Sequence, residues 1–277
     1  MSAIRVAFQG ERGAYREQAA LAIFAARGSG SPELVPQPTF DAVFAAVESA
    51  DCDYGVVPME NSLAGSVHRN YDLLLQHDLH IVAEHNLRVS HCLIAHPGVE
   101  LREIRRVYSH PQALAQCSGF LRRHGLEAVA TGDTAGSARL IREQELRGVG
   151  AIASGRAARI YELEVLAQSI EDRPDNQTRF FVIGREMLRF AGPAKTTLIM
   201  GTAHRPGALH SCLGAFARRG INLMRLESRP SRARPWEYIF YVDCEGHAED
   251  PAVAQALEEL QGLATYLKVL GSFPLDR

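Results

Sequence analysis

The stretch HIVAEHNLRVSHCLIAHP, residues 80–97, decides the fold that we predict. Its apolar and β-branched residues favour two extended segments in succession. Two later segments, LEVLAQSI (163–170) and TRFFVIG (178–184), have the same character. We therefore expect the chain to leave one lobe through the first stretch and to return through the later two, with a cleft between the lobes.

On both sides of residues 80–97 the chain alternates short apolar runs with helical patterns. The runs predict strands at residues 4–8, 54–58, 104–108, 126–131 and 149–154. The helical patterns cover residues 12–26, 40–49, 68–77, 111–124 and 134–146. This alternation predicts mostly parallel sheets with crossover helices, in which ligands bind at the carboxyl ends of strands and the starts of helices.

The pattern changes after RFAGPAKTT, residues 189–197, which has the composition of a linker. Strands are predicted at 196–203, 221–230, 236–246 and 266–273, with helices at 207–219 and 251–263. The order βαββαβ is that of a ferredoxin-like domain. The sequence therefore predicts a second, smaller domain.

Composition narrows the class of protein. The 277 residues carry a net charge of −2, with 46% hydrophobic and 22% charged residues and no long basic run, so we predict neither a nucleic-acid partner nor a membrane partner. Five dispersed cysteines, no signal peptide and no apolar run of transmembrane length indicate a cytoplasmic protein with reduced thiols. The eleven histidines form no metal-binding spacing, so no metal is predicted.

Polar residues gather where predicted strands end and helices begin. Glu60, Asn61 and Ser62 follow a strand, and capping or turn formation explains them as well as ligand binding does. Ser109 precedes Pro111 and is predicted to cap the next helix.

Two further helix starts offer similar groups. Either Asp133 or Thr134 caps the helix that follows residue 132. Gly10 and Gly13 allow backbone to approach a ligand closely, although they match no nucleotide-binding motif.

Thr178 and Arg179 stand at the start of a buried strand. A guanidinium offers two parallel donors to a carboxylate. Together with the strand and helix ends, this arginine predicts a cleft for a small, oxygen-rich anion. The residues alone indicate no nucleophilic triad and no cofactor motif.

Six motifs in this order resemble those of the prephenate dehydratase family. VPMENSLAGSV (57–67), SHPQALAQC (109–117), DTAGSA (133–138) and NQTRF (176–180) are similar to its catalytic motifs, whereas GALHSCLGAF (207–216) and ESRP (227–230) are similar to the phenylalanine-binding motifs of its ACT domain. HRNYDLLLQHDLHIV (68–82) is especially similar to the arogenate dehydratases of plants. In the first motif, the sequence Ala14-Tyr15-Arg16 departs from the family pattern, because Tyr15 supplies its only hydroxyl.

The resemblance implies an α/β fold. It consists of a two-lobed, type II periplasmic-binding-protein-like catalytic domain at 1–188, with a second lobe at about 86–165, and a ferredoxin-like ACT domain at 195–277. It implies conversion of prephenate to phenylpyruvate, carbon dioxide and water without cofactor or metal. It further implies L-phenylalanine as effector and a homodimer or homotetramer formed through ACT domains. Two alternatives remain open: dehydration of arogenate, which yields phenylalanine directly, and a non-catalytic amino-acid sensor.

The resemblance also implies roles for individual residues. The catalytic residues implied are Thr178, Asn61, Ser109 and Gln116, with Thr178 as the hydrogen-bond donor to the departing hydroxyl and His110 or Glu60 as alternative proton sources. The substrate-binding residues implied are Arg179, Ser62, Phe180, Glu60, His110 and Thr134, with Arg179 holding the side-chain carboxylate. The phenylalanine-binding residues implied are Gly207, Ala208, Leu209, Leu213, Glu227, Ser228, Arg229 and Pro230.

Overall fold

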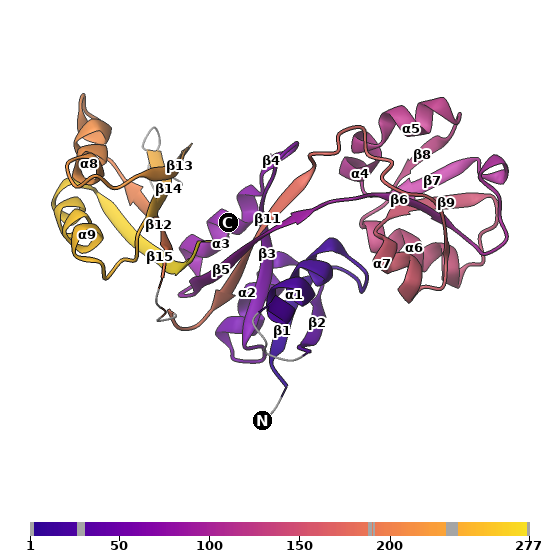
Figure 1. Cartoon of the computed structure of the whole chain (residues 1–277), viewed down its shortest axis with the longest axis horizontal. Coiled ribbons are helices and arrows are strands. Elements are labelled where there is room, and N and C mark those ends of the chain that lie inside the picture. Colours follow the sequence, from indigo (N-terminus) through magenta and orange to yellow (C-terminus); the bar gives the residue numbers. More distant parts are fainter. Residues whose placement is uncertain (1–2, 27–30, 188–189, 191, 231–237, 276–277) are drawn as a thin grey trace. The chain divides into compact units, whose positions relative to one another are not determined.

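The computed structural model describes residues 3–26, 31–187, 190, 192–230 and 238–275. The chain forms two compact units (Figure 1). Unit 1 consists of Met1–His77 and His85–Phe181, and unit 2 of Asp78–Glu84 and Val182–Arg277. Two of the three boundaries fall inside long strands, β5 (His80–Arg88) and β11 (Gln177–Gly184), and the third lies just before β5.

The first sheet has the strand order β2-β1-β3-β11-β5, with β4 paired to β3. Its remaining strands are β1 (Arg5–Gln9), β2 (Glu33–Gln37), β3 (Tyr54–Asn61) and β4 (Gly65–Ser66). The accompanying helices are α1 (Tyr15–Ala26), α2 (Phe40–Glu48) and α3 (His68–Gln76). Strand β1 runs parallel to β2 and β3, as the alternating pattern predicts. The sequence prediction missed β2, whose run ELVPQ is interrupted by a proline.

The second lobe contains a five-stranded sheet of order β10-β6-β9-β7-β8. These strands are β6 (Cys92–Ala95), β7 (Arg106–Ser109), β8 (Glu127–Ala130), β9 (Val149–Ala153) and β10 (Glu164–Ala167). Its helices are η1 (Leu101–Glu103), α4 (Pro111–Gln116), α5 (Ser118–Arg123), α6 (Thr134–Glu143) and α7 (Gly155–Ile160). The predicted helix 111–124 is thus two helices that meet at Cys117. The short helices η1 and α7 were not predicted.

Helices cover both faces of this second sheet. Strand β9 is buried along its whole length, and its side chains alternate between two apolar cores. Ala151 and Ala153 pack into one core with Ala138 and Ile141 of α6. Ile152 packs into the other core, which includes residues of α4 and α5. The continuous apolar sequence of β9 follows from this burial on both faces.

The chain passes between the two sheets twice, through β5 to β6 and through β10 to β11. Figure 1 shows β5 and β11 as long neighbouring strands, and they are adjacent in the first sheet. These are the crossings that residues 80–97, 163–170 and 178–184 predict. The predicted two-lobed α/β architecture is confirmed.

Unit 2 contains a four-stranded antiparallel sheet of order β13-β14-β12-β15. Its elements are β12 (Ala194–Gly201), α8 (Ala208–Ala217), β13 (Leu223–Pro230), β14 (Tyr238–Glu245), α9 (Pro251–Leu263) and β15 (Tyr266–Pro274). Apolar residues of both helices and of the central strands form one core. This confirms the βαββαβ order. Of the predicted linker, residues 189 and 191 lie outside the described residues, whereas 194–197 form the buried start of β12.

Residues 78–84 of unit 2 contact its later strands at two places. The Nζ atom of Lys195 lies 2.5 Å from Oε1 of Glu84, and the two side chains are only 8% and 2% exposed. A Cβ atom on Gly271 would lie 2.1 Å from the carbonyl oxygen of Ile81, so only glycine fits there. These contacts join β5 to β12 and β15.

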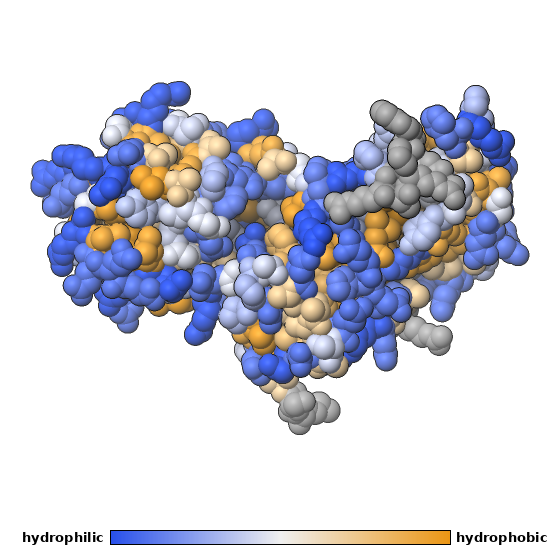
Figure 2. Space-filling model, turned by 180° about the vertical axis from the view of Figure 1, so that it is seen from behind, coloured by the Kyte–Doolittle hydropathy of each residue, from blue (hydrophilic) through white to orange (hydrophobic). Residues whose placement is uncertain are grey.

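Hydrophilic residues cover much of the face drawn in Figure 2, with hydrophobic residues in separate patches. The large hydrophobic side chains that are most exposed among the described residues are Met187, Met224, Leu226, Tyr238 and Tyr266. Within the described ranges, no helix combines the length and apolar character needed to span a membrane.

Candidate active site

Unit 1 contains a cleft of about 580 Å³ that is lined from both lobes. Its walls include the ends of β1 and β3, the start of β11 and the starts of α1, α4 and α6. The polar side chains that line it are Gln9, Tyr15, Arg16, Thr39, Asp41, Asn61, Ser66, His91, His110, Gln112, Gln116, Asp133, Thr134 and Thr178.

Asn61, the last residue of β3, organises the floor of the cleft. Its Nδ2 shares two hydrogens among three acceptors, which are Oγ1 of Thr178 at 3.0 Å, Oδ1 of Asn176 at 2.8 Å and the Gln177 carbonyl at 3.0 Å. Its Oδ1 accepts from the backbone N–H of residues 63 and 64 at 3.2 and 3.0 Å, and from Nε2 of Gln116 at 3.3 Å. The backbone donors fix which end of the amide carries oxygen.

This orientation determines the role of Thr178. Asn61 presents N–H to Oγ1, so the threonine oxygen accepts a hydrogen bond and its own proton is directed to another acceptor. Thr178 is 9% exposed and lines the cleft. Because Asn61 Nδ2 cannot accept the Thr178 proton, that proton is available to an acceptor in the cleft.

A second set of contacts fixes Gln116, at the end of α4. Its Oε1 accepts from Nδ2 of Asn176 at 3.0 Å and lies 3.0 Å from Nε2 of His91. Nδ1 of His91 lies 2.9 Å from the Tyr15 hydroxyl, which is also 2.8 Å from the Ser90 carbonyl. Burial lowers the pKa of His91. Its Nε2 donates to Gln116 Oε1, and its Nδ1 lies beside the Tyr15 hydroxyl, which donates its proton to the Ser90 carbonyl.

Arg16, in the first turn of α1, brings positive charge to the cleft. Its Nη1 lies 3.9 Å from Oδ2 of Asp133, and its guanidinium stacks on Phe40 with Cζ 5.3 Å from the ring centre. Within the described part of the chain, its buried Nε has no hydrogen-bond partner. Burial lowers the pKa of Arg16, and Asp133 opposes that shift. A carboxylate in the cleft would satisfy Nε and offset the cost of its burial.

Two helix caps stand beside Arg16. Nδ1 of His110 accepts from the Gln112 N–H at 3.2 Å, and Oδ1 of Asp133 accepts from the Gly136 N–H at 2.8 Å. Partial burial and the charge of Arg16 lower the pKa of His110, and Asp133 opposes them. Neutral His110 therefore carries its proton on Nε2. Of the two predicted caps of α6, Asp133 is the cap, and Thr134 lines the cleft as the first helical residue.

Comparison with known proteins identifies the family. Residues 6–188 match the family model of prephenate dehydratase, and residues 196–262 match that of the ACT domain. The chain is 46% identical to arogenate dehydratase/prephenate dehydratase 2, chloroplastic, of Arabidopsis thaliana, over 99% of this chain and 74% of that protein. The chain belongs to the prephenate dehydratase family. Membership of this family implies dehydratase, that is lyase, activity.

Two solved structures are similar over the whole chain. Prephenate dehydratase from Arthrobacter aurescens, in complex with L-Phe, has a TM-score of 0.88 at 33% identity, covering 98% of this chain and 90% of that one. GqqA, described as a novel type of quorum quenching acylase, has a TM-score of 0.88 at 37% identity, covering 98% of each chain. The plant relative is named as chloroplastic, and the cytoplasmic location of this chain stays a prediction.

The structure brings several of the residues implied by the prephenate dehydratase motifs into one cleft. Thr178, Asn61, Gln116, His110, Thr134 and Phe180 all line it. Sequence reasoning missed His91, Asn176 and Asp133 as contributors, and it treated Arg16 only as a departure from the family motif. Asn176 precedes the strand and has a side chain that is fully buried, which is the signal of a structural amide.

Ser109 does not cap α4 as predicted. It is the fully buried last residue of β7, and its hydroxyl donates to the Ile152 carbonyl at 2.6 Å. The cap is His110. Ser109 therefore ties β7 to β9 behind the cleft, and it is not among the lining residues.

Arg179 does not line the cleft either. Successive side chains of a strand point to opposite faces, so Thr178 and Phe180 face the cleft and Arg179 faces away. Its guanidinium stacks on Phe181, with Cζ 4.8 Å from the ring centre. Arg179 therefore lies outside the lining of this cleft, and its role in holding a carboxylate stays a prediction.

Glu60 and Ser62 also lie outside the lining. Glu60 alternates with Asn61 along β3, and its backbone is in register with Ser66 of β4. The Ser62 hydroxyl donates to the Asp175 carbonyl and accepts from the Gln177 N–H, both at 3.0 Å. Ser62 thus joins the end of β3 to the start of β11, and its role in substrate binding stays a prediction.

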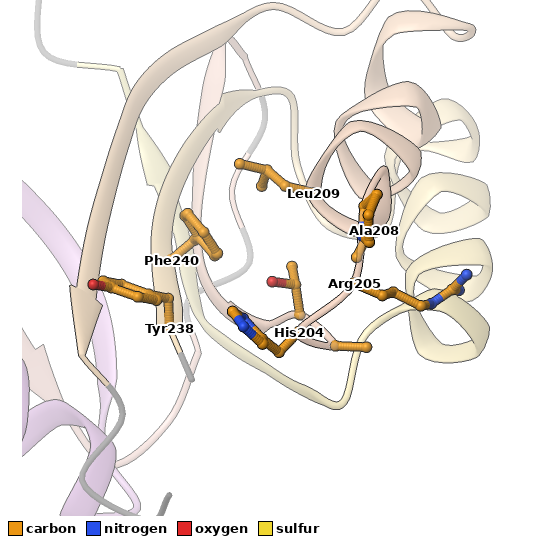
Figure 3. Close-up of a pocket in the computed structure, with 9 residues that line it drawn as sticks. His204, Arg205, Ala208, Leu209, Tyr238 and Phe240 are labelled. Atoms are coloured by element: carbon orange, nitrogen blue, oxygen red, sulfur yellow. The ribbon is translucent and has the colours of Figure 1, made fainter. Parts of the chain in front are cut away.

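The ACT domain contains its own cavity of about 420 Å³ (Figure 3). It is lined by Thr202, Ala203, His204, Arg205, Pro206, Ala208, Leu209, Tyr238 and Phe240. Figure 3 shows the aromatic side chains of β14 on one side and the start of α8 on the other. The cavity is mainly apolar, apart from the loop after β12.

The predicted phenylalanine-binding residues divide into three groups. Ala208 and Leu209 line the cavity, next to Gly207, whose φ of +80° suits glycine. Leu213 packs against the helix–sheet core instead. Residues 227–230 lie on the edge strand β13, where Arg225 and Arg229 flank Glu227, and they do not line this cavity.

Among the described residues, no group of three or more His, Cys, Asp or Glu side chains is arranged to hold a metal ion. The groups that the cleft offers are hydroxyls, side-chain amides, imidazoles, one guanidinium and carboxylates. Such a set can orient an oxygen-rich substrate, donate hydrogen bonds and balance its charge.

Proposed function

We propose that this chain converts prephenate to phenylpyruvate, carbon dioxide and water. The observation that carries the proposal is the hydrogen bond from Asn61 Nδ2 to Thr178 Oγ1, because it makes the Thr178 hydroxyl a donor toward the cleft. Membership of the prephenate dehydratase family gives the reaction class. The domains proposed for it are a catalytic domain at 1–188 and an ACT domain at 195–277.

The reaction needs few groups from the protein. The bond between the ring and its carboxylate breaks and releases carbon dioxide. Its electron pair enters the ring, and hydroxide leaves from the opposite carbon and takes up one proton to become water. A donor aimed at that oxygen stabilises the charge that develops as the carbon–oxygen bond breaks. Thr178 supplies this hydrogen bond, and Asn61 and Gln116 hold it in place.

We assign to Arg16 the carboxylate-binding role that the resemblance implies for Arg179. The guanidinium in the cleft binds the side-chain carboxylate, which is retained in the product, and its buried Nε gains an acceptor. The carboxylate that leaves is bound less tightly, because holding it would stabilise the ground state. His110 and Thr134 contact the substrate from the starts of α4 and α6. Ser109 contributes by position, through its bond to β9.

A hydrolytic function is suggested by the name of GqqA, and the geometry at Thr178 argues against it. A threonine nucleophile needs a base that accepts its proton. The hydrogen-bond partner of Thr178 Oγ1 within the described residues is the Asn61 amide, which donates to it. This arrangement favours a hydroxyl that donates over one that attacks.

Regulation belongs to the ACT domain. We propose that L-phenylalanine binds in the apolar cavity beside Gly207, Ala208 and Leu209, as the L-Phe complex of the Arthrobacter relative supports. Residues 227–230 would complete the site from a second copy of the chain, which makes the protein a homodimer or homotetramer. A ligand that binds one conformation better than another shifts the balance between them.

The test is turnover of prephenate by the purified chain, followed as phenylpyruvate formation with and without L-phenylalanine. We expect turnover that phenylalanine reduces. Arogenate is assayed in parallel, because the Arabidopsis relative is named for both substrates. If neither substrate is consumed and phenylalanine still binds, the enzyme proposal is wrong and an amino-acid sensor remains.

A further inference from the structure

The cleft contains a pair of opposite charges, Arg16 and Asp133, and the proposed dehydration gives a role only to Arg16. Nη1 of Arg16 and Oδ2 of Asp133 are 3.9 Å apart, and both side chains line the cleft. This separation is longer than a good hydrogen bond between ions, so each group retains capacity for a ligand. The side chains are 28% and 20% exposed, so the pair is partly withdrawn from water.

Gly10, which follows β1, leaves space beside this pair. A Cβ atom there would lie 3.2 Å from Oδ2 of Asp133 and 3.6 Å from Nη1 of Arg16. The φ of Gly10 is +105°, a conformation that residues with a side chain rarely adopt. The short distances and the positive φ both favour glycine at position 10, so no side chain approaches Arg16 and Asp133 from there.

The two oxygens of Asp133 have different tasks. Oδ1 accepts the Gly136 N–H and caps α6, whereas Oδ2 faces Arg16. Only Oδ1 is needed for the cap, since serine or asparagine caps a helix equally well. The N-terminus of α6 favours a negative charge at this position, but the cap itself does not require one, so the charge at Oδ2 is available to a ligand.

An α-amino acid carries an ammonium and a carboxylate on one carbon, which is the complement of an arginine beside an aspartate. A 2-keto acid has the same carboxylate but an oxygen acceptor in place of the ammonium. Asp133 attracts the ammonium and repels the keto oxygen, whereas the Nε2–H of neutral His110 can donate to the keto oxygen.

We propose that Asp133 is a specificity-determining residue that binds the ammonium of an amino-acid substrate while Arg16 binds its carboxylate. The inference rests on the proposed dehydratase function. It assigns to this cleft the aminated substrate, arogenate, in addition to prephenate. Asp133 sets the ratio of kcat/KM for the two.

The test compares that ratio in the wild-type chain and in Asp133→Asn, which keeps the capping oxygen and removes the charge. We expect the ratio of kcat/KM for arogenate to that for prephenate to fall about 10- to 100-fold, as for loss of a hydrogen bond between charged groups. Asp133→Ser, which also retains a capping oxygen, provides the second variant. Glu143→Gln removes one charge from the exposed face of the same helix and is expected to leave the ratio unchanged.

Each result distinguishes the two proposals. If the wild-type chain turns over neither substrate, the dehydratase function fails. If it turns over at least one substrate and both Asp133 variants keep the wild-type ratio, or lower both values of kcat/KM equally, the specificity role is wrong and Asp133 is only a cap. A fall in the ratio in either folded variant, with Glu143→Gln unchanged, supports the inference.

Discussion

The side-chain amides of Asn61, Gln116 and Asn176 bond to one another in the cleft of unit 1, whereas apolar side chains and a loop wall the cavity of the ACT domain. In the cleft, the direction of each hydrogen bond follows from its neighbour, starting at the backbone donors of residues 63 and 64. In the cavity, shape and apolar area dominate. A reacting group must be oriented in advance, but an effector needs only to fit one state better than another.

The largest effect is expected from changing the oriented hydroxyl. Thr178→Val keeps the shape of the side chain but removes the donor, and we expect kcat to fall about 10²- to 10³-fold, as when one transition-state donor is lost. KM should change much less. Steady-state kinetics with prephenate measure both values. Thr178→Ser restores a hydroxyl and should recover most of the rate; a fully active valine variant would contradict the assigned role.

A smaller effect on regulation is expected from a substitution in the cavity of the ACT domain. Leu209→Ala removes apolar surface beside Phe240, so the concentration of phenylalanine that gives half of its effect should rise about tenfold, as expected for a partly buried leucine side chain. Titration of the activity with phenylalanine measures this shift. An unchanged titration would show that the effector binds elsewhere, for example at β13.

The smallest effect concerns stability in acid. Burial lowers the pKa of His91 below its ordinary value of 6.5, so below that pH the unfolded chain binds a proton that the folded chain does not. Stability therefore falls as the pH decreases through this range, by at most about 1.4 kcal/mol per pH unit for one group. His91→Gln should flatten this dependence in denaturant unfolding between pH 7 and 5.5. Equal slopes in both proteins would show that His91 takes up its proton in the folded chain.

Much of the fold follows from local patterns. The crossing between the lobes could be predicted from residues 80–97, because this stretch is rich in strand-forming residues and has no helical pattern. The β2 strand was missed because Pro36, its fourth residue, lowers strand propensity. The strand lies at the edge of the sheet, where proline is tolerated. The break at Cys117 has no comparable signal, since the residues around it suit a continuous helix.

The residues of the candidate site were harder to predict from the sequence than the fold was. Thr178 and Arg179 are adjacent in sequence, and the twofold period of a strand requires that they face opposite ways, so one of the two had to leave the cleft. That choice depends on which face β11 turns toward the second lobe, a tertiary fact. His91 and Asn176 are eighty-five positions apart and meet only through Gln116. No local pattern contains such a contact.

The contacts of residues 78–84 bear on how such a protein can be divided or recombined. In the sequence, the catalytic domain ends and the ACT domain begins near residue 190. In the structure, residues 78–84 belong to the same compact unit as the ACT domain. A protein that ended at residue 188 would lack the Lys195 ammonium beside Glu84 and the glycine backbone that fits against Ile81. Exchange of regulatory domains between relatives is therefore constrained by a short segment that lies more than one hundred residues earlier, and the two must be inherited as a matched set.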